Sequence, residues 1–335
     1  MRKRGSVDKK EGRMSKHVGA RFTLLLGASV VAVVGLVSSG SALGGASQSC
    51  GTVTLNEQAW AGSTANTYVA KYVLEKKLGC KVKITKITEI PVFQAMADGK
   101  VDVVLEDWQH VDQYKQFATK QKSVVIVGSN GVIGHIGWYI PKYLLKQYPA
   151  FATWKGLKGK ESVFKSPESG SQGMFLGGDP SYVQKDKELI TLLGLNFKHV
   201  TVGAEPAQVA RFSQLIKQKK PVIFYWYTPQ YLNVQLDLTE VKLPARFKGC
   251  KDDASSGGNV KQYKCAYGIT IINKLVSKKF ATSGSPAVSF IKKWKWTNAD
   301  QNFVATQIAG KKVNPDKAAE AWVKANPAKV NAWLK

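Results

Sequence analysis

Aromatic side chains follow several predicted strands of this sequence, at the point where each strand ends. Trp60 comes after a short apolar segment, Trp108 comes after VDVVL at 101–105, and Tyr227 comes after PVIFY at 221–225. Ligands of open α/β sheets bind beyond the carboxyl ends of the strands. The electronegative faces of aromatic rings attract organic cations, by up to about 2 kcal/mol for each ring that is shielded from water. These residues therefore predict an aromatic cage suited to an organic cation.

Two further tryptophans are candidates for the same cage. Trp138 lies in HIGWYIP, just after an apolar segment, and Trp226 lies beside Tyr227 in FYWYTP. Taken singly, each of these rings is also compatible with ordinary core packing, because a large aromatic side chain gains from burial anywhere in a protein. We assign the five later tryptophans to the core: Trp154, Trp294, Trp296, Trp322 and Trp333.

Residue patterns that signal catalysis or metal binding are missing from the sequence. The histidines beyond residue 50 stand singly, without an i, i+4 pair or an HExxH motif, at positions 110, 135 and 199. No GxSxG motif occurs, and the Gly/Ser-rich segments 128–134 and 169–173 lack the Lys-Ser/Thr of a phosphate-binding loop. We therefore expect no catalytic residue, no metal site and no cofactor.

The elements that would position the aromatic residues alternate between strand and helix. One β-α-β-α-β unit is predicted from strands at 53–55, 82–87 and 101–105 and helices at 63–78 and 91–98. This order is typical of a parallel sheet covered on both faces. A second unit and a helical tail follow, with strand candidates at 162–164, 221–225 and around 270, and helices at 185–193, 207–217, 286–294, 299–309 and 315–334.

The composition is that of a basic, folded protein. The 335 residues carry 49 Lys and Arg against 23 Asp and Glu, a formal net charge of +26. A content of 44% hydrophobic residues with nine tryptophans excludes intrinsic disorder. A single apolar stretch approaches spanning length, which excludes a polytopic membrane protein. The lysines are scattered and no nucleic-acid-binding motif accompanies them, so we expect no nucleic-acid partner.

The first fifty residues have the pattern of an export signal. Residues 1–21 are rich in Lys and Arg, residues 22–37 are apolar and uncharged, and small residues follow. We interpret residues 1–50 as a signal peptide, with a cleavage site near Gly44–Ala46, or as an uncleaved anchor. Met14 is an alternative start. The mature protein would then lie in the periplasm or on the extracellular face of the plasma membrane.

The four cysteines fit an exported protein, because paired cysteines are oxidised outside the cytoplasm. Three pairings are possible, and proximity in the sequence favours Cys50–Cys80 and Cys250–Cys265. The spacing does not suit zinc, since it contains no CxxC motif. We therefore expect two disulfides.

Three segments of the sequence resemble one known family. They are STANTYVAKYVLEKKLGCKVK, QAMADGKVDVVLEDW and KKPVIFYWYTP, and the similarity extends over residues 51–335. The chain looks like the substrate-binding proteins of glycine betaine/proline-type ABC importers. The resemblance implies an α/β, type II periplasmic-binding-protein fold with two α/β lobes joined by two crossover strands. We place lobe one at 51–138 plus 266–335 and lobe two at 139–265, with crossovers near Gly137–Tyr139 and Ala266–Gly268.

The resemblance also implies roles for particular residues. Trp108 matches a cage tryptophan of the family, and Tyr227 stands where the family has a tryptophan in a W-T-P element. A second family tryptophan of lobe two aligns with Ser169, which is a departure from the pattern. Gly170 and Ser171 match positions whose backbone amides bind the ligand carboxylate in some members.

Other parts of the predicted site depart further from the family. Asp112 stands where some members have a histidine, and His110 is nearby but out of register. Trp60 and Trp138 would then replace the missing wall of the cage. An ionised Asp112 beside Glu106 and Asp107 would favour a ligand with a net positive charge, unless these carboxylates only face solvent.

The expected function is capture of glycine betaine or a related quaternary ammonium compound and its delivery to the permease of an ABC importer. The protein would be a monomer, held near the membrane by the transporter or an N-terminal anchor. A choline-like cation is the alternative ligand. Two other functions stay open: the sensing module of a receptor, and a secreted enzyme with an aromatic sugar cleft.

Overall fold

The computed structural model describes residues 50–335. The predicted signal peptide or anchor therefore lies outside the described residues, except for Cys50. Within residues 50–335, no helix has both the length and the apolar composition that crossing a membrane requires. The same part of the chain contains no group of three His, Cys, Asp or Glu side chains arranged to hold a metal ion.

One nine-stranded sheet runs through the molecule, in the order β2-β1-β3-β9-β4-β7-β5-β6, with β8 paired to β4. Strands β1, β2 and β3 are parallel, as the first predicted unit requires. Strands β5, β6 and β7 are also parallel to one another. The strands are β1 Thr52–Asn56, β2 Lys81–Thr85, β3 Val103–Asp107, β4 Val124–Pro141, β5 Gly173–Gly177, β6 Phe197–Thr201, β7 Ile223–Thr228, β8 Leu238–Glu240 and β9 Ile269–Ser277.

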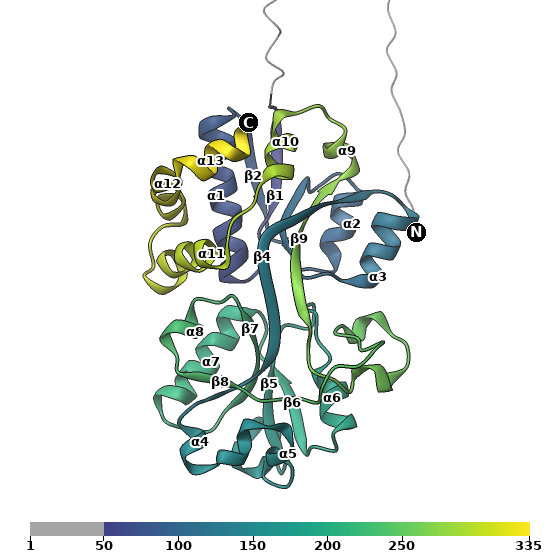
Figure 1. The fold of residues 1–335 in the computed structure, drawn as a ribbon, viewed down its shortest axis with the longest axis vertical. Coiled ribbons are helices and arrows are strands. Elements are labelled where there is room, and N and C mark those ends of the chain that lie inside the picture. Colours follow the sequence, from purple (N-terminus) through teal and green to yellow (C-terminus); the bar gives the residue numbers. More distant parts are fainter. Residues whose placement is uncertain (1–49) are drawn as a thin grey trace, which may run out of the picture. The chain divides into compact units, whose positions relative to one another are not determined.

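Figure 1 shows two groups of elements with β4 and β9 running between them. We call the group around β1–β3 lobe one and the group around β5–β8 lobe two. The antiparallel strands β4 and β9 pair along their length, and His135 of β4 opposes Ile269 of β9 where β4 begins to pair with β7. The passage between the lobes thus lies a few residues from the segments predicted as crossovers.

Helices cover both groups of strands. Those of lobe one are α1 Ala61–Lys77, α2 Pro91–Ala97, α3 Val111–Gln113, α9 Lys278–Ala281, α10 Pro286–Lys293, α11 Asn298–Ala305, α12 Pro315–Ala325 and α13 Pro327–Leu334. Those of lobe two are α4 Leu144–Gln147, α5 Trp154–Leu157, α6 Asp186–Leu192, α7 Glu205–Lys217 and α8 Leu232–Gln235. Short π and 3-10 helices are η1 Tyr114–Lys120, η2 Pro149–Ala152, η3 Glu161–Phe164, η4 Pro167–Ser169, η5 Ala254–Ser256, η6 Val260–Tyr263 and η7 Thr306–Gly310.

The strand predicted at 162–164 is wrong. That segment forms η3, and the strand of this region is β5 at Gly173–Gly177. The sequence GMFLG has a glycine at each end, so it is easily taken for a loop, but all five residues are buried in the sheet. The flanking strand β6 was also missed, because its short run FKHVT combines charged and apolar residues.

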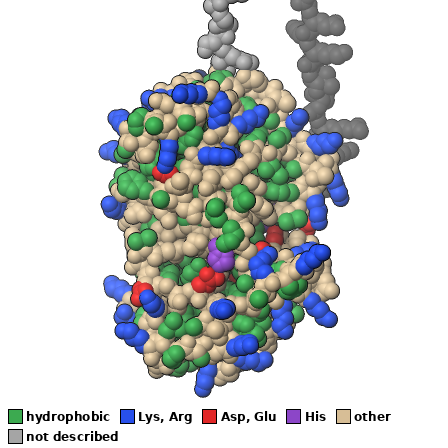
Figure 2. Space-filling model, viewed as in Figure 1, with side chains coloured by type: hydrophobic (Ala, Val, Ile, Leu, Met, Phe, Trp, Pro, Cys, Tyr) green, Lys and Arg blue, Asp and Glu red, His purple; other side chains and the backbone are tan. Residues whose placement is uncertain are grey.

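Two predictions about the core are confirmed. Trp294, Trp296, Trp322 and Trp333 are buried together in the helical tail, with Trp294 and Trp333 stacked at 4.5 Å between ring centroids. Trp154 is half-buried against the same core. Lysine and arginine side chains are spread over both lobes rather than gathered in one patch on the face shown in Figure 2.

Both predicted disulfides are present. Cys50–Cys80 joins the starts of β1 and β2, with 4.8 Å between the Cα atoms. Cys250–Cys265 closes a loop of lobe two, with 6.3 Å between the Cα atoms. The second disulfide matters for the site, because the loop that it closes reaches across to lobe one.

Candidate functional site

Five aromatic rings surround a small pocket between the lobes. The pocket has a cavity volume of about 20 Å³, which is room for about one water molecule, and it is lined by Trp60, Glu89, Trp108, Tyr182, Val183, Tyr225 and Tyr227. Each ring comes from the carboxyl end of a strand or from the segment that follows it. Trp60 is the N-cap of α1, and Trp108 follows β3 directly. The expected placement of aromatic residues at strand ends therefore holds in both lobes.

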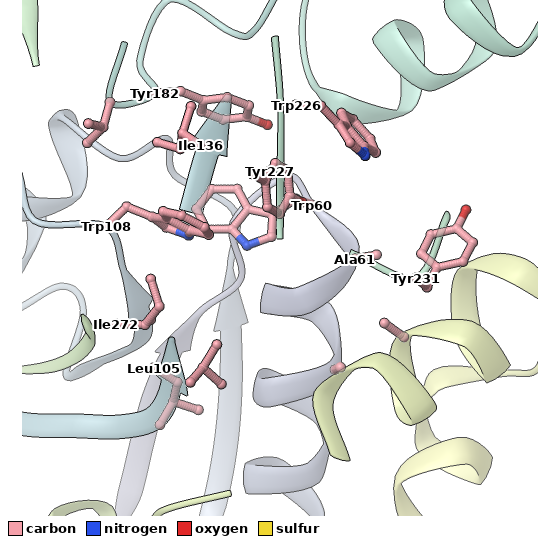
Figure 3. Close-up of a cluster of buried hydrophobic side chains, with 14 of the residues drawn as sticks. Trp60, Ala61, Leu105, Trp108, Ile136, Tyr182, Trp226, Tyr227, Tyr231 and Ile272 are labelled. Carbon is pink, nitrogen blue, oxygen red and sulfur yellow. The ribbon is translucent and has the colours of Figure 1, made fainter. Parts of the chain in front are cut away.

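Rings from opposite lobes meet edge to face across the pocket. Trp60 and Tyr182 have their centroids 5.5 Å apart at 88°, and Trp108 and Tyr227 have theirs 5.3 Å apart at 78°. Figure 3 shows the two indoles side by side, with Tyr227 next to them and Tyr182 above. Such pairs are stabilising because the positive edge of one ring faces the negative face of the other. The structure thus shows the two lobes in contact around the pocket.

One carboxylate holds both indoles of lobe one. The Oε1 atom of Glu106 accepts hydrogen bonds from Nε1 of Trp60 at 2.8 Å and from Nε1 of Trp108 at 3.2 Å. Its Oε2 atom accepts a third from Asn66 at 2.9 Å. Burial raises the pKa of Glu106 to about 7, although the two indole donors oppose the increase. Glu106 therefore orients two cage rings and places a titratable group behind them.

The ring of Trp108 occupies the space where any residue larger than glycine at position 134 would place its side chain. A Cβ atom at Gly134 would lie 2.6 Å from the Trp108 ring. Because Gly134 belongs to β4, the ring lies directly against a strand that joins the lobes. The position of this cage ring is therefore set by the strand connection as well as by Glu106.

Glu205 plays a corresponding part at the start of α7. Its side chain accepts hydrogen bonds from the Tyr227 hydroxyl, from the backbone N–H of Ala61 at 3.1 Å, and from Nε2 of Gln230 at 3.1 Å. Burial raises its pKa to about 7. Since Ala61 begins α1 of lobe one, Glu205 both orients a cage ring and joins the two lobes.

Glu89 is the one charged residue that lines the pocket. It is 3% exposed, and burial raises its pKa. Its Oε2 atom lies 3.4 Å from Nε2 of His110, and its Oε1 atom has no hydrogen-bond partner. A buried carboxylate oxygen without a donor is costly, so this atom has an unused capacity to accept a hydrogen bond.

His110 lies between two carboxylates. Its Nδ1 atom is 2.9 Å from Oδ2 of Asp253, and its Nε2 atom faces Glu89. Burial disfavours the charged ring, but the hydrogen bonds to Asp253 and Glu89 outweigh burial and raise the pKa of His110 to about 10. The residue that the sequence placed out of register is therefore a buried part of the site's surroundings.

Trp138 and Trp226 do not line the pocket. Trp138 is fully buried, packs against Phe175, and donates from Nε1 to Asp186 at 2.7 Å. Trp226 packs against Phe212 on the other side of β7, apart from the cage in Figure 3. Both are core residues of lobe two, which was the alternative interpretation of any single tryptophan.

The polar residues that were carried over from the family also lie elsewhere. Ser169, Gly170 and Ser171 precede β5, at the end of the parallel strands opposite Tyr227, and Ser169 bonds back to Ser166. The Asp112 side chain is 41% exposed and pairs with Lys115 at 3.3 Å. We therefore leave these four residues out of the site.

Sequence reasoning missed four lining residues, which are Glu89, Tyr182, Val183 and Tyr225. A signal for Tyr225 was available, because alternate residues of a strand face the same side and Tyr227 was already a candidate. Tyr182 follows the overlooked strand β5. Glu89 precedes a short helix and carries no local pattern, so its role depends on the tertiary structure.

A larger cavity of about 430 Å³ lies beside the cage and shares Trp60 with it. It is bounded by α1, α7 and η7, and its lining includes Lys86 and Lys312. The lining also includes Glu57 and Glu205, which balance the two lysines, but only Trp60 and Tyr231 contribute aromatic rings. The smaller pocket is therefore the better candidate for the binding site.

Comparison with known proteins gives consistent results. A family model described as the substrate-binding domain of ABC-type glycine betaine transport systems matches residues 51–325. The trimethylamine N-oxide-binding protein of Pelagibacter ubique (strain HTCC1062) is 23% identical over 321 residues, which cover 91% of this chain and 96% of the relative.

Solved structures show the same fold. Lactococcal OpuAC, in its closed form with glycine betaine, has a TM-score of 0.63 at 20% identity and covers 85% of this chain and 99% of its own. ProX from Borrelia burgdorferi has a TM-score of 0.67 at 20% identity, covering 85% and 97%. A choline-binding protein in complex with choline has 0.66 at 20% identity, covering 85% and 92%.

These neighbours establish a periplasmic-binding-protein fold, as the sequence predicted. The match to the family model extends over most of the chain. It indicates substrate binding for a transporter, which the fold alone would not show. The protein therefore belongs to the family of substrate-binding domains of ABC-type glycine betaine transport systems, and it is the substrate-binding component of an ABC transporter of this family.

Proposed function

We propose that the protein captures a quaternary ammonium cation in the aromatic cage and delivers it to the permease of an ABC importer. The observation that carries this proposal is the pocket itself, in which five rings enclose a space bordered by a buried carboxylate. Rings and carboxylates both attract a positive charge in a site that excludes water. The named relative binds trimethylamine N-oxide, which shares a methylated nitrogen with such ligands.

We further propose that the ligand is choline-like rather than betaine-like, which reverses our first expectation. A betaine carboxylate needs hydrogen-bond donors or a positive group, but no Lys, Arg or His lines the pocket, and the lining donor without a partner is the hydroxyl of Tyr182 alone. Glu89 presents an unpaired oxygen that accepts but does not donate when it is ionised. A hydroxyl group near the ammonium would supply the missing donor.

The proposed motion is closure of lobe one, 51–138 plus 266–335, onto lobe two, 139–265. Both lobes contribute rings to one pocket, so each chain contains the complete site and a monomer is sufficient. Ligand binding drives closure only if the ligand binds the closed state better than the open state. Export directed by residues 1–50 would place this cycle outside the cytoplasm, next to the permease.

The test is calorimetric titration of the full-length protein with choline, glycine betaine and trimethylamine N-oxide. Choline should bind most tightly, and mass analysis should recover it unchanged. Glu89→Gln should weaken choline binding roughly tenfold, about 1.4 kcal/mol, and should improve betaine binding relative to choline. Asp112→Asn is the matched control, because this carboxylate is exposed and outside the pocket. Failure of all three compounds to bind would overturn the proposal.

A further inference from the structure

The loop closed by Cys250–Cys265 reaches from lobe two to the surroundings of the pocket. Its Asp253 is 5% exposed, and Oδ2 of Asp253 lies 2.9 Å from Nδ1 of His110 in lobe one. The other carboxylate oxygen accepts a hydrogen bond from the backbone N–H of Ser255 at 2.9 Å. Asp253 is thus held by its own loop while it makes a buried contact with the opposite lobe.

The loop is anchored firmly within lobe two. Lys185 is fully buried, and its Nζ atom donates to the backbone oxygen of Lys251 at 2.7 Å and to Asp252 at 2.9 Å. The same atom also lies 3.3 Å from the backbone oxygen of Ala266. Together with the disulfide, these bonds fix both ends of the loop. Because the loop is fixed to lobe two, a contact between Asp253 and lobe one also holds lobe two against lobe one.

The imidazole ring of His110 connects this loop to the pocket. Both ring nitrogens face carboxylates, and a neutral imidazole has only one N–H group. Nδ1 is hydrogen-bonded to Asp253, whereas Nε2 lies 3.4 Å from Glu89 without a hydrogen bond, and the two carboxylates together favour the imidazolium ion. Glu89, on the far side of the ring, lines the pocket, and its Oε1 atom is buried without a hydrogen-bond partner. The three side chains therefore form a line from the loop to the ligand space.

The charges along this line differ between a closed and an open molecule. In lobe one alone, the positive charge of His110 offsets the negative charge of Glu89. Closure adds the negative charge of Asp253 from lobe two to a group that also includes the buried carboxylate of Asp107. A ligand with a net positive charge would favour the arrangement that carries this additional charge.

We propose that the disulfide-closed loop 250–265 is a charge latch, which adds Asp253 to the Glu89–His110 pair on closure and so couples cation binding to closure. His110 and Asp253 are then positioning residues that act through Glu89 and do not touch the ligand. The coupling to a cationic ligand rests on the proposed function. The contact between His110 and Asp253 can be tested without any ligand.

The first test needs no ligand. Asp253→Asn keeps the size of the side chain and its cap on Ser255 but removes the charge. Nuclear magnetic resonance of the His110 ring in the full-length protein should show that the imidazolium loses its proton at a lower pH in Asp253→Asn than in the wild type. An unchanged titration of His110 would overturn the latch, whatever the protein binds.

The second test compares ligands of different charge. In calorimetry, Asp253→Asn should weaken choline binding roughly tenfold and should change the binding of trimethylamine N-oxide, which has no net charge, by much less. Equal losses for both compounds, or no loss for choline, would overturn the coupling. If the wild-type protein binds neither compound, the proposed function fails, while the titration of His110 still decides whether the contact exists. Asp112→Asn is the control for a general charge effect.

The two disulfides provide a matched pair of variants. Cys250→Ser with Cys265→Ser should weaken choline binding several-fold, because a loosened loop holds Asp253 less well. Cys50→Ser with Cys80→Ser removes a disulfide in lobe one and should lower the melting temperature without changing the affinity. Circular dichroism would verify that both variants fold. Equal affinities for choline in the two variants would show that the Cys250–Cys265 disulfide does not contribute to the latch. The Asp253→Asn variant would then decide whether Asp253 itself contributes.

Discussion

The two walls of the cage are built differently. In lobe one, a single carboxylate, Glu106, accepts hydrogen bonds from both indoles, so Trp60 and Trp108 are held as one unit. In lobe two, the tyrosine rings are held separately. Tyr227 bonds to Glu205, and Tyr225 donates to the backbone oxygen of Val183 at 3.3 Å. The first wall is complete within its own lobe.

The second wall depends partly on closure. Glu205 receives a hydrogen bond from Ala61 of lobe one, and the hydroxyl of Tyr182 is buried without a hydrogen-bond partner. Tyr182 is held instead by its edge-to-face contact with Trp60. The difference indicates that lobe one presents a preorganised half-site and that lobe two completes the cage when the lobes meet. This comparison can be tested by breaking each wall in turn.

The largest effect should come from removing a ring of the preorganised wall. Trp108→Ala deletes a cation–π face together with its apolar contact and should cost about 2 kcal/mol, or roughly thirtyfold in affinity for choline. Trp226→Ala is a poor control because that ring is in the core, so Trp226→Phe should be used and should leave the affinity unchanged. Calorimetry would measure both. An unaltered affinity in Trp108→Ala would remove this ring from the site.

A smaller loss should follow when the rings stay but their common anchor is weakened. Glu106→Gln retains the shape of the side chain but removes its charge, so the oxygen that Trp60 and Trp108 share becomes a weaker acceptor, and an amide nitrogen replaces the oxygen that accepts from Asn66. We expect a loss of about 1 kcal/mol, roughly fivefold, in affinity for choline. An affinity for choline that is unchanged in Glu106→Gln would mean that Glu106 is not the shared anchor.

In lobe two, the corresponding change should cost less. Tyr227→Phe keeps the ring and removes only its hydrogen bond to Glu205, so the free lobes keep their shape and closure becomes slightly less favourable. We expect a loss in affinity of about 0.5–1 kcal/mol, at most roughly fivefold. X-ray scattering at saturating choline should show the same closed dimensions as the wild type. A failure to close would mean that this wall is as preorganised as the other.

The smallest effect concerns pH. The pKa values of Glu106 and Glu205 are raised by burial to about 7, against an ordinary value of 4.5. A bound cation favours the ionised carboxylates, so choline binding should release protons and should strengthen several-fold from pH 6 to pH 8. Calorimetry in two buffers of different ionisation enthalpy would count the protons. Proton uptake on binding would contradict this assignment.

The same pKa values give the sign of the stability change in the ligand-free protein. The folded state holds more protons than the unfolded state between about pH 4.5 and 7 at both carboxyls, so burial of these groups destabilises the fold increasingly as pH rises through that interval. His110, whose pKa is raised to about 10, adds stability that is complete below about pH 6.5 and is lost toward pH 10. Thermal unfolding of the ligand-free protein should therefore shift to lower temperature as pH rises from 5 to 9.

The aromatic residues that were predicted for the site and those that line the pocket can be compared along single strands. Trp60, Trp108 and Tyr227 were found because the carboxyl ends of strands meet at one edge, which is a property of the sheet that local sequence reveals. Trp226 was included because it lies next to Tyr227, although neighbours in a strand face opposite sides. Applying that alternation would have selected Tyr225 instead, which lines the pocket.

The errors in lobe two have a different origin. Ser169, Gly170 and Ser171 were assigned by resemblance, and the glycine-bounded strand β5 that follows them was not predicted. Once β5 is recognised, these residues precede a parallel strand and lie at the end of the sheet away from Tyr227. A missed strand of five residues thus moved part of the predicted site to the wrong end of the lobe.

The sequence by itself determined the α/β architecture, the two disulfides, and the three aromatic residues that end strands on the ligand side. Periodicity and strand order are local properties, so they can be recognised without coordinates. Only the tertiary structure decided which charges accompany those rings. Glu89, His110 and Asp253 are far apart in the sequence, and their pairing depends on a loop of one lobe packing against the other. Such a contact has no local pattern, because its geometry arises from the packing of complete lobes.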